Sequence, residues 1–253
     1  MNSGGRTWYR RPAGVFLIAL AAGLFLICTL FGILVFKDLR LMKEGKLDPE
    51  RGAEQQLFQA SLSRKFSNAA PTSDDLKRIE PTGRVPSLGD PKAKIRIVEF
   101  VDYGCPYCRQ AAPVVRSYLA AHPNDVYLLI RDYPITELHP QAEDDAIAAD
   151  CVFQQDEKKY WLYSDRLFAS QEAQTADDLR LYAQQVGADL SRYDACVRSK
   201  TPLAAIKGSI DDGNAAGVGA TPTFFFNGVK IEGAIPQDAF AQIVDQARIS
   251  AGN

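Results

Sequence analysis

Hydrophobic and polar positions single out one long apolar run near the start of the chain. Residues 15–36 contain no charged residue and are rich in Leu, Ile, Phe and Ala. Because about 20 such residues in a helix cross the hydrocarbon core of a membrane, the run predicts a transmembrane anchor. A cleaved signal peptide is the alternative, but the run is longer than a typical signal core and ends in Leu-Val-Phe-Lys, a poor cleavage site.

The next stretch, residues 37–89, is predicted to form a juxtamembrane helix and a linker. Within 53–66, the apolar residues Leu57, Phe58, Leu62 and Phe66 recur at helical spacing. This amphipathic helix is expected to pack on its own domain or lie at the membrane surface, and the alternative is a surface for homodimerisation or partner docking. Pro and Gly residues collect in 67–90, which indicates a flexible tether.

From residue 90 onward, strand and helix periods alternate, which predicts one α/β domain over 90–251. Strands are expected at 95–101 and 126–131 around a helix at 109–121, and a hairpin at 223–232 turns at Asn227-Gly228. A helix over 236–251 ends the domain. Between these two parts lies a helical insertion of about 139–206, with helices at 139–155, after the capping residue Thr175, and from Asp189.

The charge composition argues against nucleic acid as a partner. The 253 residues carry a formal net charge of −2, so basic and acidic residues nearly balance and no nucleic-acid footprint is present.

The strand at 95–101 leads directly into Cys105-Pro106-Tyr107-Cys108. Cys105 is therefore expected at a helix N-terminus, where free backbone N–H groups stabilise a thiolate, the attacking form in thiol–disulfide exchange. The alternative is a zinc site, which needs two further ligands at close spacing. The two histidines, His122 and His139, are not spaced as a ligand pair, so we expect a redox pair without metal or cofactor.

Two separated motifs resemble the DsbA-like thiol–disulfide oxidoreductases of the thioredoxin superfamily. They are the nonapeptide that starts at Phe100 and ends at Cys108, and the segment 217–225 around Thr221-Pro222. The resemblance covers about 91–251. It implies a thioredoxin fold with a helical domain inserted after the second strand, in which Cys105 attacks and Cys108 resolves.

The resemblance also implies roles for residues outside the cysteines. Pro222 falls at the family's cis-proline, with Thr221 before it, and Glu99 matches a buried acid that moves a proton to or from Cys108. For Glu99 the alternative is an exposed strand carboxylate. Pro106 and Tyr107 are expected to tune the pair, and Tyr107, in place of a histidine between the cysteines, predicts a less oxidising pair.

Cys151 and Cys196 lie 45 positions apart in two of the predicted inserted helices. A structural disulfide between them is the favoured interpretation, and two buried free thiols are the alternative.

Basic residues flank the apolar run on both sides and do not orient it in the membrane. A C-x-x-C pair together with two further cysteines able to form a disulfide suits an oxidising compartment. We therefore expect residues 1–14 in the cytoplasm and the domain in a bacterial periplasm, anchored in the inner membrane.

Together these features favour a membrane-tethered enzyme that introduces disulfides into exported proteins. The implied partner is a DsbB-like, quinone-linked membrane oxidase. One alternative is an isomerase or reductase kept reduced by a DsbD-like carrier, and another is an assembly factor that holds the cysteines of a single client. The redox state in cells separates the first two hypotheses.

Overall fold

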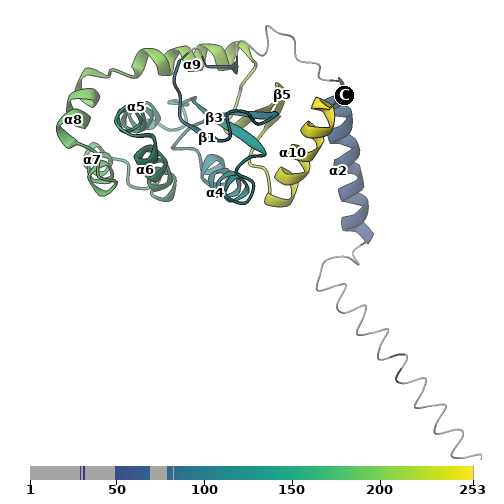
Figure 1. Cartoon of the computed structure of the whole chain (residues 1–253). Coiled ribbons are helices and arrows are strands. Elements are labelled where there is room, and N and C mark those ends of the chain that lie inside the picture. Colours follow the sequence, from purple (N-terminus) through teal and green to yellow (C-terminus); the bar gives the residue numbers. More distant parts are fainter. Residues whose placement is uncertain (1–28, 30, 32–48, 69–78, 82, 253) are drawn as a thin grey trace, which may run out of the picture. The chain divides into compact units, whose positions relative to one another are not determined.

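The computed structural model describes residues 29, 31, 49–68, 79–81 and 83–252 (Figure 1). Except for Thr29 and Phe31, the predicted anchor at 15–36 and the terminus at 1–14 lie outside these residues. No helix among the residues described is both long and apolar enough to cross a membrane. The chain divides into two compact units, 1–60 and 61–253, and the second holds the sheet and the site.

A five-stranded sheet in the order β1-β3-β2-β4-β5 forms the centre of the second unit. β2 lies parallel to β3, and the other three neighbouring pairs are antiparallel. The central strand β2 is buried at six of its seven positions, which explains its nearly continuous apolar sequence. The strands are β1 (Ser87–Gly89), β2 (Ile95–Val101), β3 (Val126–Asp132), β4 (Thr223–Phe226) and β5 (Val229–Glu232).

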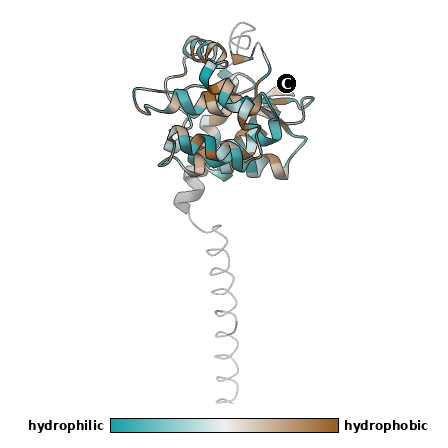
Figure 2. Ribbon diagram, turned by 90° about the vertical axis from the view of Figure 1, so that its left-hand side faces the viewer, coloured by the Kyte–Doolittle hydropathy of each residue, from teal (hydrophilic) through white to brown (hydrophobic). Residues whose placement is uncertain are grey.

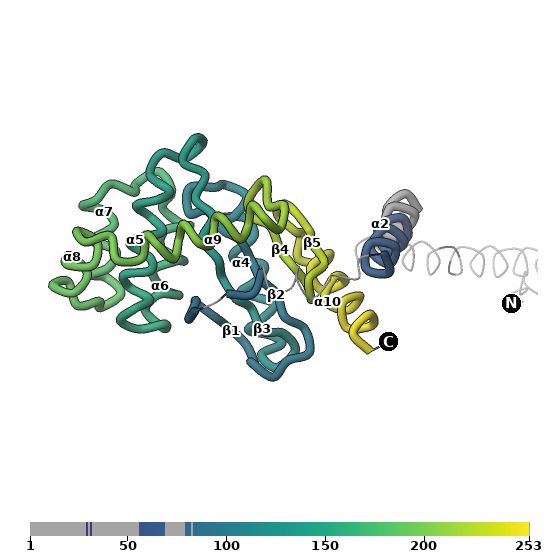
Figure 3. The backbone as a smooth tube through the Cα atoms, turned by 90° about the horizontal axis from the view of Figure 1, so that it is seen from above, coloured from purple at the N-terminus to yellow at the C-terminus, as the bar shows by residue number. Residues whose placement is uncertain are grey.

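Helices surround this sheet, and α5 to α8 gather beyond one end of it while α10 lies on the other side (Figure 3). Teal and brown residues mix along the outer helices, as expected of helices with one buried face (Figure 2). The helices are α2 (Pro49–Asn68), α4 (Pro106–Ala121), α5 (Ala142–Phe153), α6 (Glu157–Ala169), α7 (Ala176–Gln185), α8 (Leu190–Ser199), α9 (Leu203–Ala215) and α10 (Gln237–Ala251).

The fold is the predicted one, a thioredoxin fold in which α5 to α9 interrupt the chain between β3 and β4. Local signals in the insertion act as expected: Thr175 and Asp178 form a reciprocal capping box at the start of α7. Asp189 caps α8 by accepting from the N–H of Arg192. The helical stretch extends to Ala215, nine residues beyond the predicted end of the insertion.

Two features before residue 90 differ from the expectation. Residues 83–89, expected in a flexible tether, include β1, which pairs with β3, and Ile79 is buried in the core. In α2, Leu62 and Phe66 are buried, whereas Leu57 of the predicted apolar stripe is exposed. The periodicity placed the helix correctly but assigned it a buried face that is too long.

Candidate active site

The loop from β2 to α4 places Cys105 at the N-cap of the helix, as the sequence predicts. Cys105 has extended backbone angles, and Pro106 occupies the first turn, where a missing N–H costs nothing. The Cys105 N–H donates to the carbonyl of Asp102, and the Cys105 carbonyl accepts from Arg109, each at 3.1 Å. The thiols of Cys105 and Cys108 are free, and Tyr107 between them is exposed.

Hydrogen bonds around the sulfur make Cys105 acidic. They lower the pKa of Cys105 from 9.0 to about 5, and the largest contribution is the hydrogen bond with the Cys108 side chain. Burial opposes this shift, while the interaction with Thr221 and the backbone N–H groups of Cys108 and Tyr107 add to it. The thiolate of Cys105 is therefore the predominant form at neutral pH.

Cys108 behaves in the opposite way because it lies deeper. Its side chain is fully buried, and burial, together with the interaction with Cys105, raises the pKa of Cys108 well above its ordinary value. The two thiols of one motif thus differ in protonation. Cys105 can attack, and Cys108 retains its proton until a base removes it.

Glu99 is buried rather than exposed. Its residue is 4% exposed, and burial raises the pKa of this carboxyl to about 8, with Arg116 opposing the rise. Glu99 and Arg116 line a cavity of about 20 Å³, room for one water molecule. The Glu99 carboxyl also acts on the active pair directly, since its charge adds to the rise in the pKa of Cys108. A carboxyl that titrates near neutral pH and interacts with this thiol is a candidate proton donor and acceptor.

Thr221 and Pro222 lie against Cys105, joined by a cis peptide bond. The Cys105 Sγ donates to the Thr221 carbonyl oxygen at 3.2 Å. The Thr221 hydroxyl is buried and has no hydrogen-bond partner within the described part of the chain. The structure therefore brings the Thr221-Pro222 segment to the active pair, although Thr221 lies 116 positions after Cys105.

One contact of the active-site loop was not anticipated from the sequence. The buried Asp102 carboxylate contacts His139 Nδ1 at 2.8 Å and accepts from the N–H groups of Gly104 and Ile135, also at 2.8 Å. The sequence alone led us to consider His139 as a possible metal ligand and to give it no role in the active site. The sequence held one signal for this contact, since Asp102 lies inside the redox motif and the chain has only two histidines that could pair with it.

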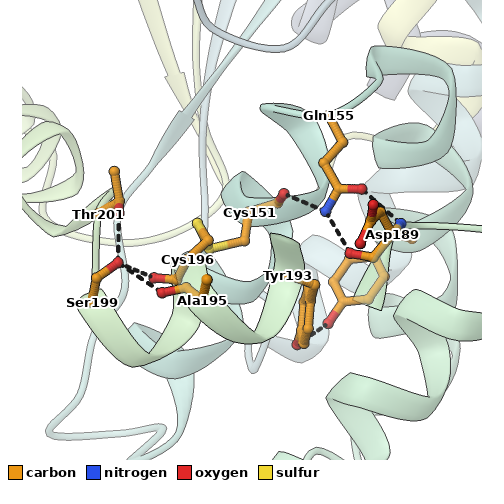
Figure 4. The surroundings of a disulfide bond; sticks show 9 residues. Cys151, Gln155, Asp189, Tyr193, Ala195, Cys196, Ser199 and Thr201 are labelled. Carbon is orange, nitrogen blue, oxygen red and sulfur yellow. Dashed lines mark hydrogen bonds between the residues drawn. A yellow bond between two sulfur atoms is a disulfide. The ribbon is translucent and has the colours of Figure 1, made fainter. Parts of the chain in front are cut away.

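Cys151 and Cys196 form a disulfide between α5 and α8 (Figure 4). Gln155 lies beside it and bridges α5 to the start of α8, since its amide donates to the carbonyls of Cys151 and Asp189 and accepts from the Asp189 N–H. This pair lies in the helical insertion, in different elements from the free thiols. Among the residues described, no group of three or more His, Cys, Asp or Glu could hold a metal ion.

A family model described as thioredoxin matches residues 81–246. The chain belongs to the thioredoxin family. The match begins before β1, so it includes the residues that were expected to form a tether.

Curated relatives are much longer proteins. The Na(+)/H(+) antiporter NhaA 3 of Salinispora tropica is 33% identical over 163 residues, 64% of this chain and 24% of that protein. NhaA 1 of Mycolicibacterium vanbaalenii is 31% identical over 170 residues, 66% of this chain and 27% of that protein. The chain thus spans about a quarter of the length of these relatives, and the name antiporter describes the longer proteins.

Solved structures share the fold over nearly their whole length. The thiol-disulfide exchange protein alpha-DsbA2 of Wolbachia pipientis has a TM-score of 0.62 at 18% identity, covering 74% of this chain and 96% of that chain. A thioredoxin-like oxidoreductase from Silicibacter pomeroyi DSS-3 has a TM-score of 0.58 at 29% identity, covering 71% and 99%. The dithiol at the N-terminus of α4 thus lies in a domain that has the fold of these thioredoxin-like proteins.

Proposed function

We propose that this protein is a membrane-tethered oxidase that introduces disulfides into exported proteins in a bacterial periplasm. The observation that carries the proposal is the acidic Cys105 thiol beside the buried Cys108. A stabilised thiolate favours the reduced enzyme, and an enzyme with a stable reduced form takes electrons readily from its substrates. The pKa of about 5 lies between about 3.5 for DsbA and about 7 for thioredoxin.

The first chemical step transfers the enzyme disulfide to the substrate. A substrate thiolate attacks the Cys105 sulfur of the oxidised enzyme, and the Cys105–Cys108 bond breaks. The electron pair of that bond passes to Cys108, which takes up a proton because the pKa of its thiol is raised. Glu99, with a pKa of about 8 and an electrostatic effect on Cys108, is the proposed proton donor.

The second step forms the substrate disulfide. A second substrate thiolate attacks the substrate sulfur in the mixed disulfide, and Cys105 leaves as its thiolate. The substrate loses two electrons and the enzyme dithiol gains them. Because Cys105 is a stable thiolate, it is a good leaving group in this step. Another turnover needs an oxidant, for which we propose a quinone-linked membrane partner of the DsbB kind.

Two observations support a position at the membrane. The run at 15–36 is long and apolar enough in sequence to span a bilayer. The matched region also occurs in longer proteins named as Na(+)/H(+) antiporters. In an oxidising compartment, both the Cys151–Cys196 disulfide and the recycling of the active pair are chemically sustainable.

Trapping of clients tests the proposal most directly. In the Cys108→Ala variant the Cys105 thiolate can still attack a client disulfide, which is the reverse of the second step, but the Cys108 thiol that would release the client in that direction is missing. Mixed disulfides between Cys105 and exported proteins should therefore accumulate. Non-reducing electrophoresis of cell extracts measures these species, and Cys105→Ala/Cys108→Ala is the control. Trapping of one client alone would instead support a dedicated assembly factor, and an absence of adducts would contradict the proposal.

The redox state in cells tests the direction of electron flow. An oxidase recharged by a quinone-linked partner is mostly disulfide at steady state, whereas an isomerase or reductase supplied by a DsbD-like carrier is mostly dithiol. Acid quenching followed by alkylation with a mass-tagged maleimide separates the two forms. A mostly reduced Cys105–Cys108 pair would contradict the oxidase and favour the isomerase or reductase.

A further inference from the structure

A side chain from the helical insertion contacts the backbone of the active-site loop. Gln171, in the turn after α6, donates from its amide nitrogen to the carbonyl oxygens of Tyr103 and Cys105, at 2.8 Å each. One amide group thus connects two alternate residues of the loop that leads to the attacking cysteine. Gln171 lies 66 positions after Cys105 and belongs to neither motif of the resemblance.

Other contacts join the same loop to the insertion. The Tyr103 hydroxyl lies 2.8 Å from that of Tyr160 on α6, and both rings are fully buried. Asp102 contacts His139, just before α5. These two contacts engage side chains of the loop, whereas the Gln171 side chain engages its backbone. The Cys105 carbonyl is therefore held from two sides, by the Gln171 amide of the insertion and by the N–H of Arg109 in α4.

We propose that Gln171 is a positioning residue that holds the Cys105 backbone in the orientation in which the first turn of α4 stabilises the Cys105 sulfur. The inference deepens the proposed exchange function, on which its redox consequence rests. The Cys105 carbonyl accepts both from Gln171 and from the N–H of Arg109 in α4. Gln171 thereby links the insertion to the helix end that faces the thiolate.

The physical reason has two parts. First, the backbone N–H groups of Tyr107 and Cys108 stabilise the thiolate only while the N-cap geometry of Cys105 is kept. Second, the Gln171 amide binds the carbonyls of Tyr103 and Cys105 with the positive end of its N–H dipoles, and so partly neutralises the negative ends of these carbonyl dipoles in the loop that carries the thiolate. Loss of the amide should weaken the thiolate through both effects.

The test is the acidity of Cys105 in purified full-length protein. Gln171→Ala removes both hydrogen bonds, and Gln171→Glu keeps the size of the side chain but replaces the donor with a carboxylate. Both variants should raise the pKa of Cys105 by about one unit, measured from the ultraviolet absorbance of the thiolate during a pH titration. At neutral pH, the equilibrium constant against glutathione should then shift about tenfold toward the disulfide form of the enzyme.

Gln174 provides a matched control three residues further along the same connection. It is a buried glutamine whose amide donates to the carbonyl of Leu167 in α6, at 3.2 Å, and not to the active-site loop. Gln174→Ala should lower the melting temperature without changing the pKa of Cys105.

Three outcomes separate the hypotheses. The proposal is overturned if both Gln171 variants keep the wild-type pKa of Cys105, or if Gln174→Ala raises it equally. A rise in both Gln171 variants only, in a protein that oxidises no substrate, would uphold the positioning role and reject the proposed function. Because the titration needs no substrate, failures of the two proposals are distinguishable.

Discussion

The two cysteine pairs of this chain have the same functional groups and opposite environments. Cys105 and Cys108 are three positions apart, free, and at the beginning of a helix. Cys151 and Cys196 are 45 positions apart, joined, and inside two helices. Within a helix, the backbone N–H groups bond to carbonyls one turn earlier, so they are not available to a sulfur. At the N-terminus they are free.

Burial alone therefore does not explain the difference between the pairs. Cys105 and Cys151 are both buried, 5% and 1% exposed. What distinguishes Cys105 is the set of donors around its sulfur, from the Cys108 side chain and the first turn of α4. A cysteine thus becomes reactive when it lies at a helix N-terminus, with hydrogen-bond donors around its sulfur and a sequence-distant loop packed against it. A cysteine inside a helix lacks such donors and serves a structural role.

Loss of the attacking thiol should produce the largest effect on activity. Cys105→Ala is expected to lower the rate of disulfide transfer to a reduced peptide by more than about a thousandfold, because no other thiolate is placed to react. Cys151→Ala/Cys196→Ala should keep most of the activity. Oxidation of a fluorescent dithiol peptide measures both. Equal losses in the two variants would remove the functional distinction between the pairs.

Loss of the structural pair should produce the larger effect on stability. The disulfide closes a loop of 45 residues, so Cys151→Ala/Cys196→Ala should lower the free energy of unfolding by about 3 to 4 kcal/mol in the entropic model. Urea unfolding followed by circular dichroism measures the change, with Gln155→Ala as a control for the neighbouring hydrogen bonds. An unchanged midpoint would mean that the bond does not constrain the unfolded chain.

Replacement of the buried Glu99 should have a smaller effect on stability, and this effect should depend on pH. Burial raises the pKa of Glu99 from 4.5 to about 8, so between these values the folded protein retains a proton that the unfolded chain releases. The carboxyl therefore destabilises the fold increasingly as the pH rises through this window. Glu99→Gln should be more stable than wild type by up to a few kcal/mol above pH 8 and equal to it below pH 4.5.

Unfolding by urea at several pH values checks this prediction, with the Cys105–Cys108 pair kept reduced. Glu143→Gln on α5 provides a matched control, because the Glu143 side chain is partly exposed and ion-paired with Lys200. A difference between Glu99→Gln and wild type that does not vary with pH would show that the buried carboxyl is not the titrating group.

Much of the fold was predictable because its signals are local. The strand at 95–101, the Asn227-Gly228 turn, and the caps at Thr175 and Asp189 each depend on a few neighbouring residues, and the structure has them at the predicted positions. The position of the C-x-x-C cysteines was predictable for the same reason, since a strand, a C-x-x-C and a helix in that order place Cys105 at a helix N-terminus. The burial of Ile79 and the pairing of β1 with β3 were missed because the proline and glycine content of this stretch resembles that of a linker.

The rest of the site depends on residues that meet only in the folded chain. Thr221 reaches Cys105 across 116 positions, Gln171 across 66, and His139 reaches Asp102 across 37. No local pattern encodes such a contact, because it arises when the insertion and the β4 side of the sheet pack around one loop. The sequence thus specifies which sulfur is reactive, and the packing around it sets how acidic that sulfur is, since hydrogen bonds and burial act over a few ångströms in space.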